Sequence, residues 1–262
     1  MSHSTKTSDI SSSPCTTHFA IIIPAYNEQA TIHDIASRAL NISPLVFVVD
    51  DGSTDQTLEK LENLPIKLIK NTTNSGKAAS LWTGIQAARL HKVKYIISLD
   101  GDGQHAPEDI PKLLIRAKLN PEHIIIGARL ADKTSIPARR YYANRIANFW
   151  LAWAAGYPIS DSQSGFRVYP AKLFNNLKML TRKRDSFVFE SAILIKAAQR
   201  GIQSSAITIP AIYAANARPS HFRGVRDITL ITLMVARSLI TRGFYPQGFY
   251  RAYIKPYLFP QS

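Results

Sequence analysis

Residues 45–55 read LVFVVDDGSTD, and this stretch decides the fold class of the chain. Its apolar first half is rich in β-branched residues and predicts a strand buried on both faces, as in a parallel sheet. Similar apolar runs recur at 19–24, 66–69, 95–99 and 124–127, separated by helical patterns at 28–41, 54–64, 77–91 and 107–119. Strands that alternate with helices predict an α/β fold, a mostly parallel sheet with helices on both faces.

The strict alternation stops after residue 130. Beyond it we expect helices at 139–155, 187–200 and 225–241 and a late strand at 206–212. Residues 1–17 are rich in Ser and Thr and predict a disordered tail. Residues 18–222 are expected to form the α/β domain, and 223–262 a basic, aromatic extension with an amphipathic helix.

Charge is distributed unevenly along the 262 residues. The chain has 32 Lys and Arg against 18 Asp and Glu, a net charge of +14. Residues 1–130 hold 13 basic and 13 acidic residues, net zero, whereas 131–262 hold 19 and 5, net +14. The second half is therefore expected to face an anionic partner.

Composition also bounds the class of protein. Apolar residues make up 45% of the chain, which suits a folded core. No apolar run reaches the roughly 18 residues of a membrane-spanning helix, and we expect no secretory signal. Cys15 is the single cysteine, so an intramolecular disulfide is excluded and a reducing compartment is expected.

Polar residues follow three of the predicted strands, where the carboxyl ends of a parallel sheet bind ligands. Asp100 and Asp102 follow the strand at 95–99, with Gln104 close behind. Such oxygen ligands suit Mg²⁺ or Mn²⁺, although an Asp-Gly turn gives the same pattern. The glycine fingerprint of dinucleotide-binding domains and the P-loop motif are both missing.

Two further segments allow two interpretations each. Asp50-Asp51 is either a turn, with Ser53 or Thr54 capping the next helix, or a pair that hydrogen-bonds a base or ribose. The segment 74–77, NSGK, either caps the following helix or binds an anion at its start.

The chain resembles the family 2 glycosyltransferases of the GT-A fold in five ordered segments: IIIPAYNE (21–28), VVDDGSTD (48–55), NSGKAASLWTG (74–84), SLDGDGQH (98–105) and DSQSGFR (161–167). FVFESAILIKAAQRG (187–201) and IPAIY (209–213) continue the likeness, which spans about 19–222. Dolichyl- and polyprenyl-phosphate sugar transferases are the most similar group. The resemblance implies a Rossmann-like GT-A domain and a metal-dependent, inverting transfer from a nucleoside-diphosphate sugar.

The resemblance also implies roles for the matching residues. It implies that the nucleotide is bound by Pro24, Tyr26, Glu28, Asp51, Lys77 and Asp100. It places the divalent cation, Mg²⁺ or Mn²⁺, on Asp100, Asp102 and Gln104. It assigns the sugar and acceptor side to the segment 161–167 and to Glu190, so the expected catalytic residues are Asp161, Glu190 and Arg167.

The expected acceptor is lipid-linked, namely polyprenyl phosphate. A lipid phosphate is already anionic and needs cations rather than a general base. The expected acceptor contacts are Arg139, Arg140, Arg145, Gln163, Ser164, Arg218 and Ser220, with Arg167 as a further cation. If the acceptor is instead a hydroxyl of a lipid, pigment or polysaccharide precursor, a base is needed, and Asp161 is the first candidate and Glu190 the second.

Two departures from the family concern the acceptor. The stretch 218–223, RPSHFR, replaces the usual Arg-x-x-Gly-x-Ser segment, and the membrane-spanning helices of many relatives are missing. The basic, aromatic residues of 223–262 predict binding to an anionic membrane surface, with docking on the domain or a dimer contact as alternatives. The expected location is cytoplasmic, peripheral at the inner face of the membrane.

Two other classes of function fit the sequence less well. A nucleic-acid-binding protein would explain the positive charge, but no zinc, RNP-like or helix-turn-helix pattern supports it, and acidic strand ends repel nucleic acid. We therefore expect no nucleic-acid partner. A catalytically inactive module that binds sugar nucleotides is disfavoured, because acidic residues are present at the ends of all three strands that are expected to form the site.

Overall fold

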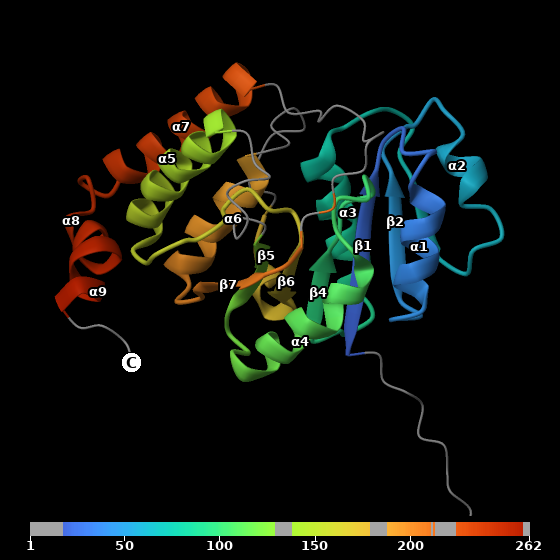
Figure 1. Cartoon of the computed structure of the whole chain (residues 1–262), viewed down its shortest axis with the longest axis horizontal. Helices are drawn as coiled ribbons and strands as arrows, with labels where there is room; N and C mark the ends of the chain where they lie inside the picture. Colours follow the sequence, from blue (N-terminus) through green and yellow to red (C-terminus); the bar gives the residue numbers. More distant parts are fainter. Residues whose placement is uncertain (1–17, 129–137, 179–187, 211, 213–223, 259–262) are drawn as a thin grey trace, which may run out of the picture.

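A computed structural model describes residues 18–128, 138–178, 188–210, 212 and 224–258 (Figure 1). The predicted tail, 1–17, lies outside the described residues. The strands of the described residues form one sheet, in the order β3-β2-β1-β4-β6-β5-β7. Its strands are β1 (Phe19–Ala25), β2 (Val46–Asp50), β3 (Lys67–Lys70), β4 (Tyr95–Ser98), β5 (Ile124–Ala128), β6 (Arg167–Pro170) and β7 (Ser204–Thr208).

The predicted mostly parallel sheet is confirmed, with one strand reversed. β6 pairs antiparallel with both β4 and β5, and every other pair in the described sheet is parallel. β6 was not among the predicted strands, because it has four residues, starts with an arginine and ends with a proline. β7 begins and ends earlier than the predicted strand at 206–212, and its first two residues are serines.

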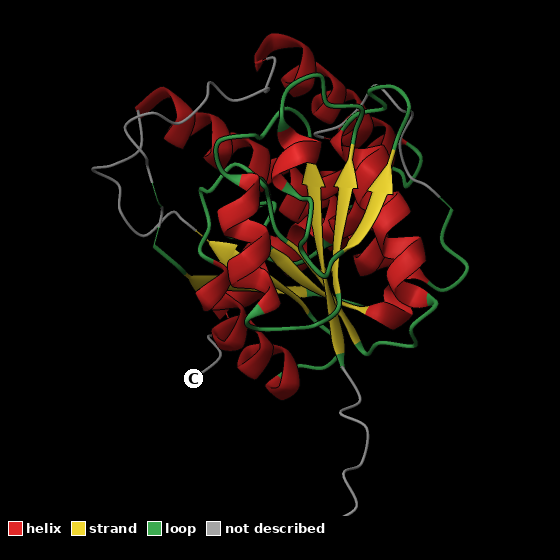
Figure 2. Cartoon of the chain, turned by 90° about the vertical axis from the view of Figure 1, so that its right-hand side faces the viewer, coloured by secondary structure: helices red, strands yellow, loops and turns green. Residues whose placement is uncertain are grey.

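Helices cover both faces of the sheet (Figure 2). One face packs on α1 (Ile32–Leu40) and α4 (Ile110–Leu119) through strand residues such as Ile21 and Ile23. The alternate residues Ala20 and Ile22 face the other side, where α3 (Lys77–Arg89) and α6 (Val188–Gln199) pack. The predicted helix at 54–64 is reduced to α2 (Thr57–Lys60). Short 3₁₀ turns follow at Pro107–Asp109 and Ala171–Phe174.

Two longer helices form a further layer beyond α6 (Figure 1). α5 (Ala138–Ala155) and α7 (Gly224–Ile240) pack against α6 and against each other. α7 is the predicted amphipathic helix, and its Ile231, Val235 and Leu239 are buried in the core that contains α3. This part of the predicted extension is therefore docked on the α/β domain.

The Tyr- and Phe-rich segment 246–258 is also helical. α8 (Pro246–Phe249), a π-helical turn (Tyr250–Ile254) and α9 (Lys255–Leu258) follow one another, and α8 packs on α5. The wider turn precedes Pro256, whose ring would clash with the carbonyl four residues earlier in a regular helix. Among the described helices, none combines the length and the apolar character that a membrane span requires.

Candidate active site

The predicted polar segments meet at the carboxyl edge of the sheet, where β1, β2 and β4 end side by side. Asn27 ties the first two turns together from a left-handed conformation with φ 55°. Its backbone N–H donates to Ser53 Oγ at 2.8 Å, and its Oδ1 accepts from the Thr54 N–H at 2.7 Å. Asn27 is not among the predicted site residues. Its signal is an asparagine two residues after the end of a strand, since asparagine tolerates this backbone.

Asp51 holds the loop in front of α3. The side chain is buried, and Oδ1 accepts hydrogen bonds from the Ser75 N–H at 2.9 Å and from Asn71 Nδ2 at 2.8 Å. Oδ2 accepts from the Gly76 N–H at 2.7 Å. Asp51 therefore positions Lys77, the first residue of α3. Its contact with a nucleotide stays a prediction.

Asp50 offers an acceptor at the same edge. The residue is 1% exposed, and its Oδ2 accepts from the Ser53 N–H at 3.2 Å. Its Oδ1 is buried and has no hydrogen-bond partner among the described residues. Three other residues that are predicted to bind the nucleotide are half-buried at this edge: Pro24, Tyr26 and Glu28. The edge therefore presents acidic and aromatic groups to a ligand.

Lys77 connects this edge to α6. Its Nζ lies 2.7 Å from Asp100 Oδ1 and 3.1 Å from Glu190 Oε1. Burial opposes the charge, but the two carboxylates outweigh it and raise the pKa of Lys77 above its ordinary value. Glu190 is 4% exposed, and its Oε2 is buried without a hydrogen-bond partner in the described part of the chain. The predicted base Glu190 is thus paired with an ammonium group.

Gly165 leaves the space in which Lys77 and Asp100 meet. A Cβ on this glycine would lie 2.6 Å from Asp100 Oδ2 and 2.7 Å from Lys77 Nζ. The Gly165 carbonyl accepts a hydrogen bond from Ser98 Oγ at 2.5 Å, which holds the loop over the end of β4. The loop and the ion pair therefore fit each other closely.

The variant Gly165→Ala should slow the sugar transfer that the family resemblance implies by roughly tenfold or more, because displacements of about 1 Å near reacting groups have large effects. Steady-state rates measure this change. Gly201→Ala is the matched control, since its φ is 76° and no atom lies within 4 Å of the added Cβ. It strains the backbone without crowding a site. Wild-type activity in Gly165→Ala would contradict the assignment of the site.

Arg167 lies in the interior rather than at the acceptor surface. Its side chain is 0% exposed, and Nε donates to the Ser164 carbonyl at 2.8 Å. Nη1 donates to the Glu190 carbonyl and Nη2 to the Ser162 carbonyl, both at 2.7 Å. The sequence predicted a catalytic residue and acceptor cation here. In the structure Arg167 positions the backbone, because its donors point at main-chain carbonyls.

The loop that carries Asp161 is tightly held. Asp161 is 2% exposed, and its Oδ1 accepts from the N–H groups of Gln163 and Ser164, each at 3.2 Å. Ser164 Oγ donates to the Gly127 carbonyl at 2.6 Å. The predicted residues Asp161, Gln163 and Ser164 are therefore brought beside the end of β5, on the α6 side of the cluster around Lys77.

α5 borders the same loop. Asn148 Oδ1 accepts from the Ser162 N–H at 3.0 Å, and Asn148 Nδ2 donates to the Ser160 carbonyl at 2.6 Å. Arg145, a predicted acceptor contact, is exposed on the same helix. Other predicted contacts are not placed by the structure: the side chains of Arg139 and Arg140 on α5, and the whole of Arg218 and Ser220, lie outside the described residues.

Asp100, Asp102 and Gln104 are the predicted metal ligands, and all three are half-buried after β4. Asp102 Oδ1 accepts from the Gln104 N–H at 3.0 Å. The described residues contain no group of three or more His, Cys, Asp or Glu side chains that could hold a metal ion. Mg²⁺ needs only one or two carboxylates when phosphates and water complete its coordination. The donor set fits a hard cation that binds together with a diphosphate.

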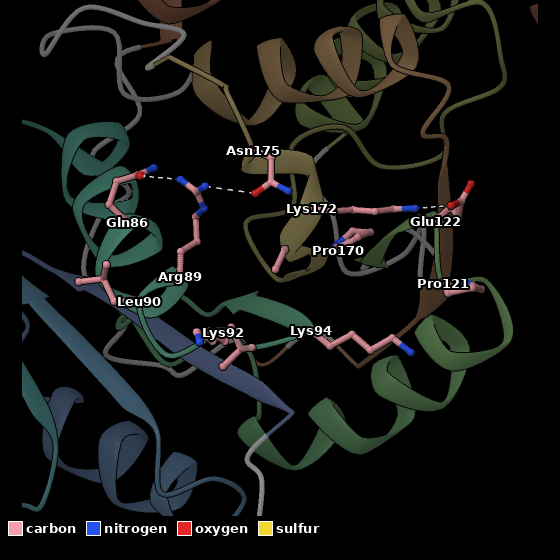
Figure 3. A pocket seen from close by; sticks show the side chains of 12 residues that line it. Gln86, Arg89, Leu90, Lys92, Lys94, Pro121, Glu122, Pro170, Lys172 and Asn175 are labelled. Atoms are coloured by element: carbon pink, nitrogen blue, oxygen red, sulfur yellow. Dashed lines mark hydrogen bonds and ion pairs between the residues drawn. The ribbon is translucent and has the colours of Figure 1, made fainter.

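A cavity of about 560 Å³ lies elsewhere, at the opposite edge of the sheet, beside the start of β4 and β5 and the end of β6 (Figure 3). Arg89 crosses one side of it and donates to Gln86 and Asn175. Lys172 pairs with Glu122 on the other side. None of the predicted site residues lines this cavity. We therefore place the candidate active site at the carboxyl edge of the sheet.

Comparison with known proteins agrees with this geometry. The model of the family "Glycosyl transferase family 2" matches residues 20–178. An uncharacterized protein of Methanocaldococcus jannaschii is 31% identical over 80% of this chain and 86% of its own length. UDP-N-acetylglucosamine–dolichyl-phosphate N-acetylglucosaminyltransferase of Methanococcus voltae is 28% identical over 67% and 79%. Polyprenol monophosphomannose synthase of Mycolicibacterium smegmatis is 25% identical over 72% and 75%.

Solved structures share the fold. Glucosyl-3-phosphoglycerate synthase of Mycobacterium tuberculosis, crystallised with Mn²⁺, UDP-glucose and phosphoglyceric acid, superposes with a TM-score of 0.62. The alignment covers 86% of this chain and 79% of that chain at 17% identity, which shows the fold alone. The family match, by contrast, covers more than half of the chain and includes β1, β2 and β4 with their polar ends. The chain therefore belongs to glycosyl transferase family 2 and is a glycosyltransferase.

Proposed function

We propose that this chain transfers a sugar from a nucleoside-diphosphate sugar to a polyprenyl phosphate, in a metal-dependent reaction that inverts the anomeric carbon. One observation carries the proposal. Lys77, Asp100 and Asp102 gather at the carboxyl edge of β4, where α/β sheets bind their ligands. Relatives named as dolichyl-phosphate and polyprenol-monophosphate transferases support this class of acceptor.

The donor diphosphate is assigned to the cluster after β4. Asp100, Asp102 and Gln104 would hold Mg²⁺ or Mn²⁺, which supplies neutralisation of the charge on the leaving diphosphate. Lys77 stays protonated at neutral pH and provides a fixed positive charge beside it. The buried Asp50 Oδ1 is a free acceptor for an N–H or O–H group of the nucleoside.

The state of the two acceptor-side carboxylates favours a phosphate acceptor. Asp161 accepts hydrogen bonds from its own loop, and Glu190 pairs with Lys77. A hydroxyl acceptor would need one of them as a base. A lipid phosphate oxygen is already ionised and attacks the anomeric carbon directly. The new C–O bond forms as the bond to the nucleoside diphosphate breaks, and the configuration inverts.

A thermal-shift panel of nucleoside diphosphates and their sugars, with Mn²⁺, Mg²⁺ or EDTA, tests the donor site. A ligand at about 100 times its Kd stabilises a protein by about 2.7 kcal/mol. We expect a shift that EDTA removes. Asp102→Asn, which keeps the shape of the side chain and removes one charge, should lose the metal-dependent part. No shift with any nucleotide in either metal would overturn the proposed function.

A further inference from the structure

We propose that the outer sides of α5 and of the C-terminal helices form a docking surface for an anionic lipid bilayer. The inference rests on the proposed lipid acceptor and adds which face of the protein meets the membrane. We call this surface the aromatic face, and it comprises Ile146, Phe149, Trp150, Ile254, Tyr257 and Leu258.

The first observation is that two apolar helical stripes point to solvent. Ile146, Phe149 and Trp150 on α5 are 62%, 39% and 43% exposed, and their spacing of three and four residues puts them on one side of the helix. Such a stripe normally packs into a core. Ile254, Tyr257 and Leu258 repeat the pattern with exposures of 40%, 88% and 60%.

Aromatic contacts join the two stripes into one surface. Phe149 stacks on Tyr253 with ring centroids 4.9 Å apart, and the Tyr253 O–H donates to the Phe149 carbonyl at 2.6 Å. Trp150 stacks on Trp153 at 5.5 Å, and Trp153 contacts Phe249 edge to face at 5.2 Å. Contiguous exposed apolar patches mark interaction sites.

The positive charge beside the aromatic face favours an anionic bilayer as its binding partner. Arg145, Arg251 and Lys255 are exposed on the helices that carry the stripes. The sequence of 138–155 and 229–258 contains no Asp or Glu. Anionic lipids attract such basic segments, and Trp and Tyr favour the membrane interface. A symmetric dimer through this face would instead bring two basic surfaces together.

The position of the face relative to the active site supports a lipid acceptor. Asn148 lies on the side of α5 away from Ile146 and Phe149, since successive helical residues turn by about 100°. Its amide holds the backbone of Ser160 and Ser162. The acceptor-side loop is therefore attached to the helix that would rest on the membrane. Docking there would hold the loop one helix diameter, about 10 Å, from the aromatic face, near the lipid headgroups among which a polyprenyl phosphate carries its phosphate.

Vesicle sedimentation of the full chain tests the proposal, with phosphatidylcholine vesicles that contain or lack phosphatidylglycerol. We expect binding to the anionic vesicles. The triple variant Ile254→Ser, Tyr257→Ser, Leu258→Ser should weaken binding by roughly tenfold or more. Burial of even one large apolar side chain changes an affinity by about this factor. Arg251→Ala with Lys255→Ala should weaken it about fivefold per charge.

A matched control removes three exposed apolar residues from another surface. Leu90, Ile115 and Leu119, at the end of α3 and on α4, are 83%, 62% and 71% exposed. Replacing all three with serine should leave vesicle binding unchanged. The Trp150 side chain gives a second readout, because its fluorescence should shift to shorter wavelength on binding and the shift should be lost in Trp150→Phe.

Three outcomes would overturn the inference: wild-type protein that stays in the supernatant, equal losses in both triple variants, or a dimer that the aromatic-face variant dissociates while vesicle binding persists. The last outcome would mean that a second copy covers this face. Transfer to a short-chain prenyl phosphate in solution separates this inference from the proposed function. The aromatic-face variant should retain that activity, whereas failure of the wild type would remove the proposed function and leave vesicle binding as an independent result.

Discussion

The variant Lys77→Met is expected to lower sugar transfer by about 10²- to 10³-fold, the usual loss when one fixed charge-stabilising group is removed from an active site. Lys77 Nζ contacts Asp100 and Glu190 at 2.7 and 3.1 Å, so its removal leaves two carboxylates facing each other without a cation. Both the affinity for the donor and the turnover rate should fall. Nucleotide titration and single-turnover rates separate the two effects.

The same variant should lower the free energy of unfolding by about 2 to 3 kcal/mol, somewhat less than for a fully buried pair. The folded-state pKa of Lys77 lies above its unfolded value, so its stabilisation is complete below the unfolded pKa and is lost only as pH rises through the folded one. The difference between wild type and variant should therefore stay constant from about pH 6 to pH 9. Urea unfolding at both ends of this window measures it.

Lys172→Met is the matched control. Lys172 pairs with Glu122 at the surface, where the two side chains are 52% and 66% exposed. Its loss should change stability by less than about 1 kcal/mol and leave activity intact, since exposed ion pairs contribute little. Equal effects of the two lysine variants would contradict the role given to Lys77.

The variant Arg167→Met is expected to lower the free energy of unfolding by about 3 to 5 kcal/mol. Its guanidinium donates to the carbonyls of Ser162, Ser164 and Glu190, all inside the protein, and methionine leaves them without these donors. Arg167→Lys should also destabilise, because one ammonium lacks the planar fork that reaches three directions. Thermal and urea unfolding test both variants.

Arg200 provides the control for Arg167. It also donates to three main-chain carbonyls, those of Leu173, Asn175 and Asn176, but it is exposed and water can replace it. Arg200→Met should cost less than about 1 kcal/mol. A stable Arg167→Met protein that has lost only activity would contradict the positioning role and would restore the catalytic role predicted from the sequence.

Much of the sheet could be predicted because buried parallel strands leave a direct mark in the sequence. The runs around Ile21, Val48 and Ile97 are apolar on both faces and end in turn residues. β6 leaves no such mark, because it begins with the charged residue Arg167, whose donors bind the main-chain carbonyls of Ser162, Ser164 and Glu190. The helical nature of 246–258 was hidden by Pro246 and Pro256, which are tolerated at a helix start and after a π-helical turn.

The sequence could predict which residues of the candidate site lie at the ends of strands. Asp51, Asp100 and Asp102 follow apolar runs, so their convergence follows from the topology of a parallel sheet. The pairing of Lys77 with Glu190 could not be predicted, because 113 positions separate them and only the packing of α6 beside α3 joins them. The structural role of Arg167 was missed because burial of its guanidinium against main-chain carbonyls leaves no pattern in the sequence.

The most direct test of the proposed reaction is a transfer assay with mass-spectrometric detection of the product. Wild-type protein is incubated with Mn²⁺ or Mg²⁺, a panel of nucleoside-diphosphate sugars and a polyprenyl phosphate, and Asp102→Asn serves as the inactive control. We predict a polyprenyl phosphate that carries one sugar, with inverted anomeric configuration, together with free nucleoside diphosphate. Transfer to a hydroxyl acceptor such as the free polyprenol, with none to the phosphate, would contradict the proposal.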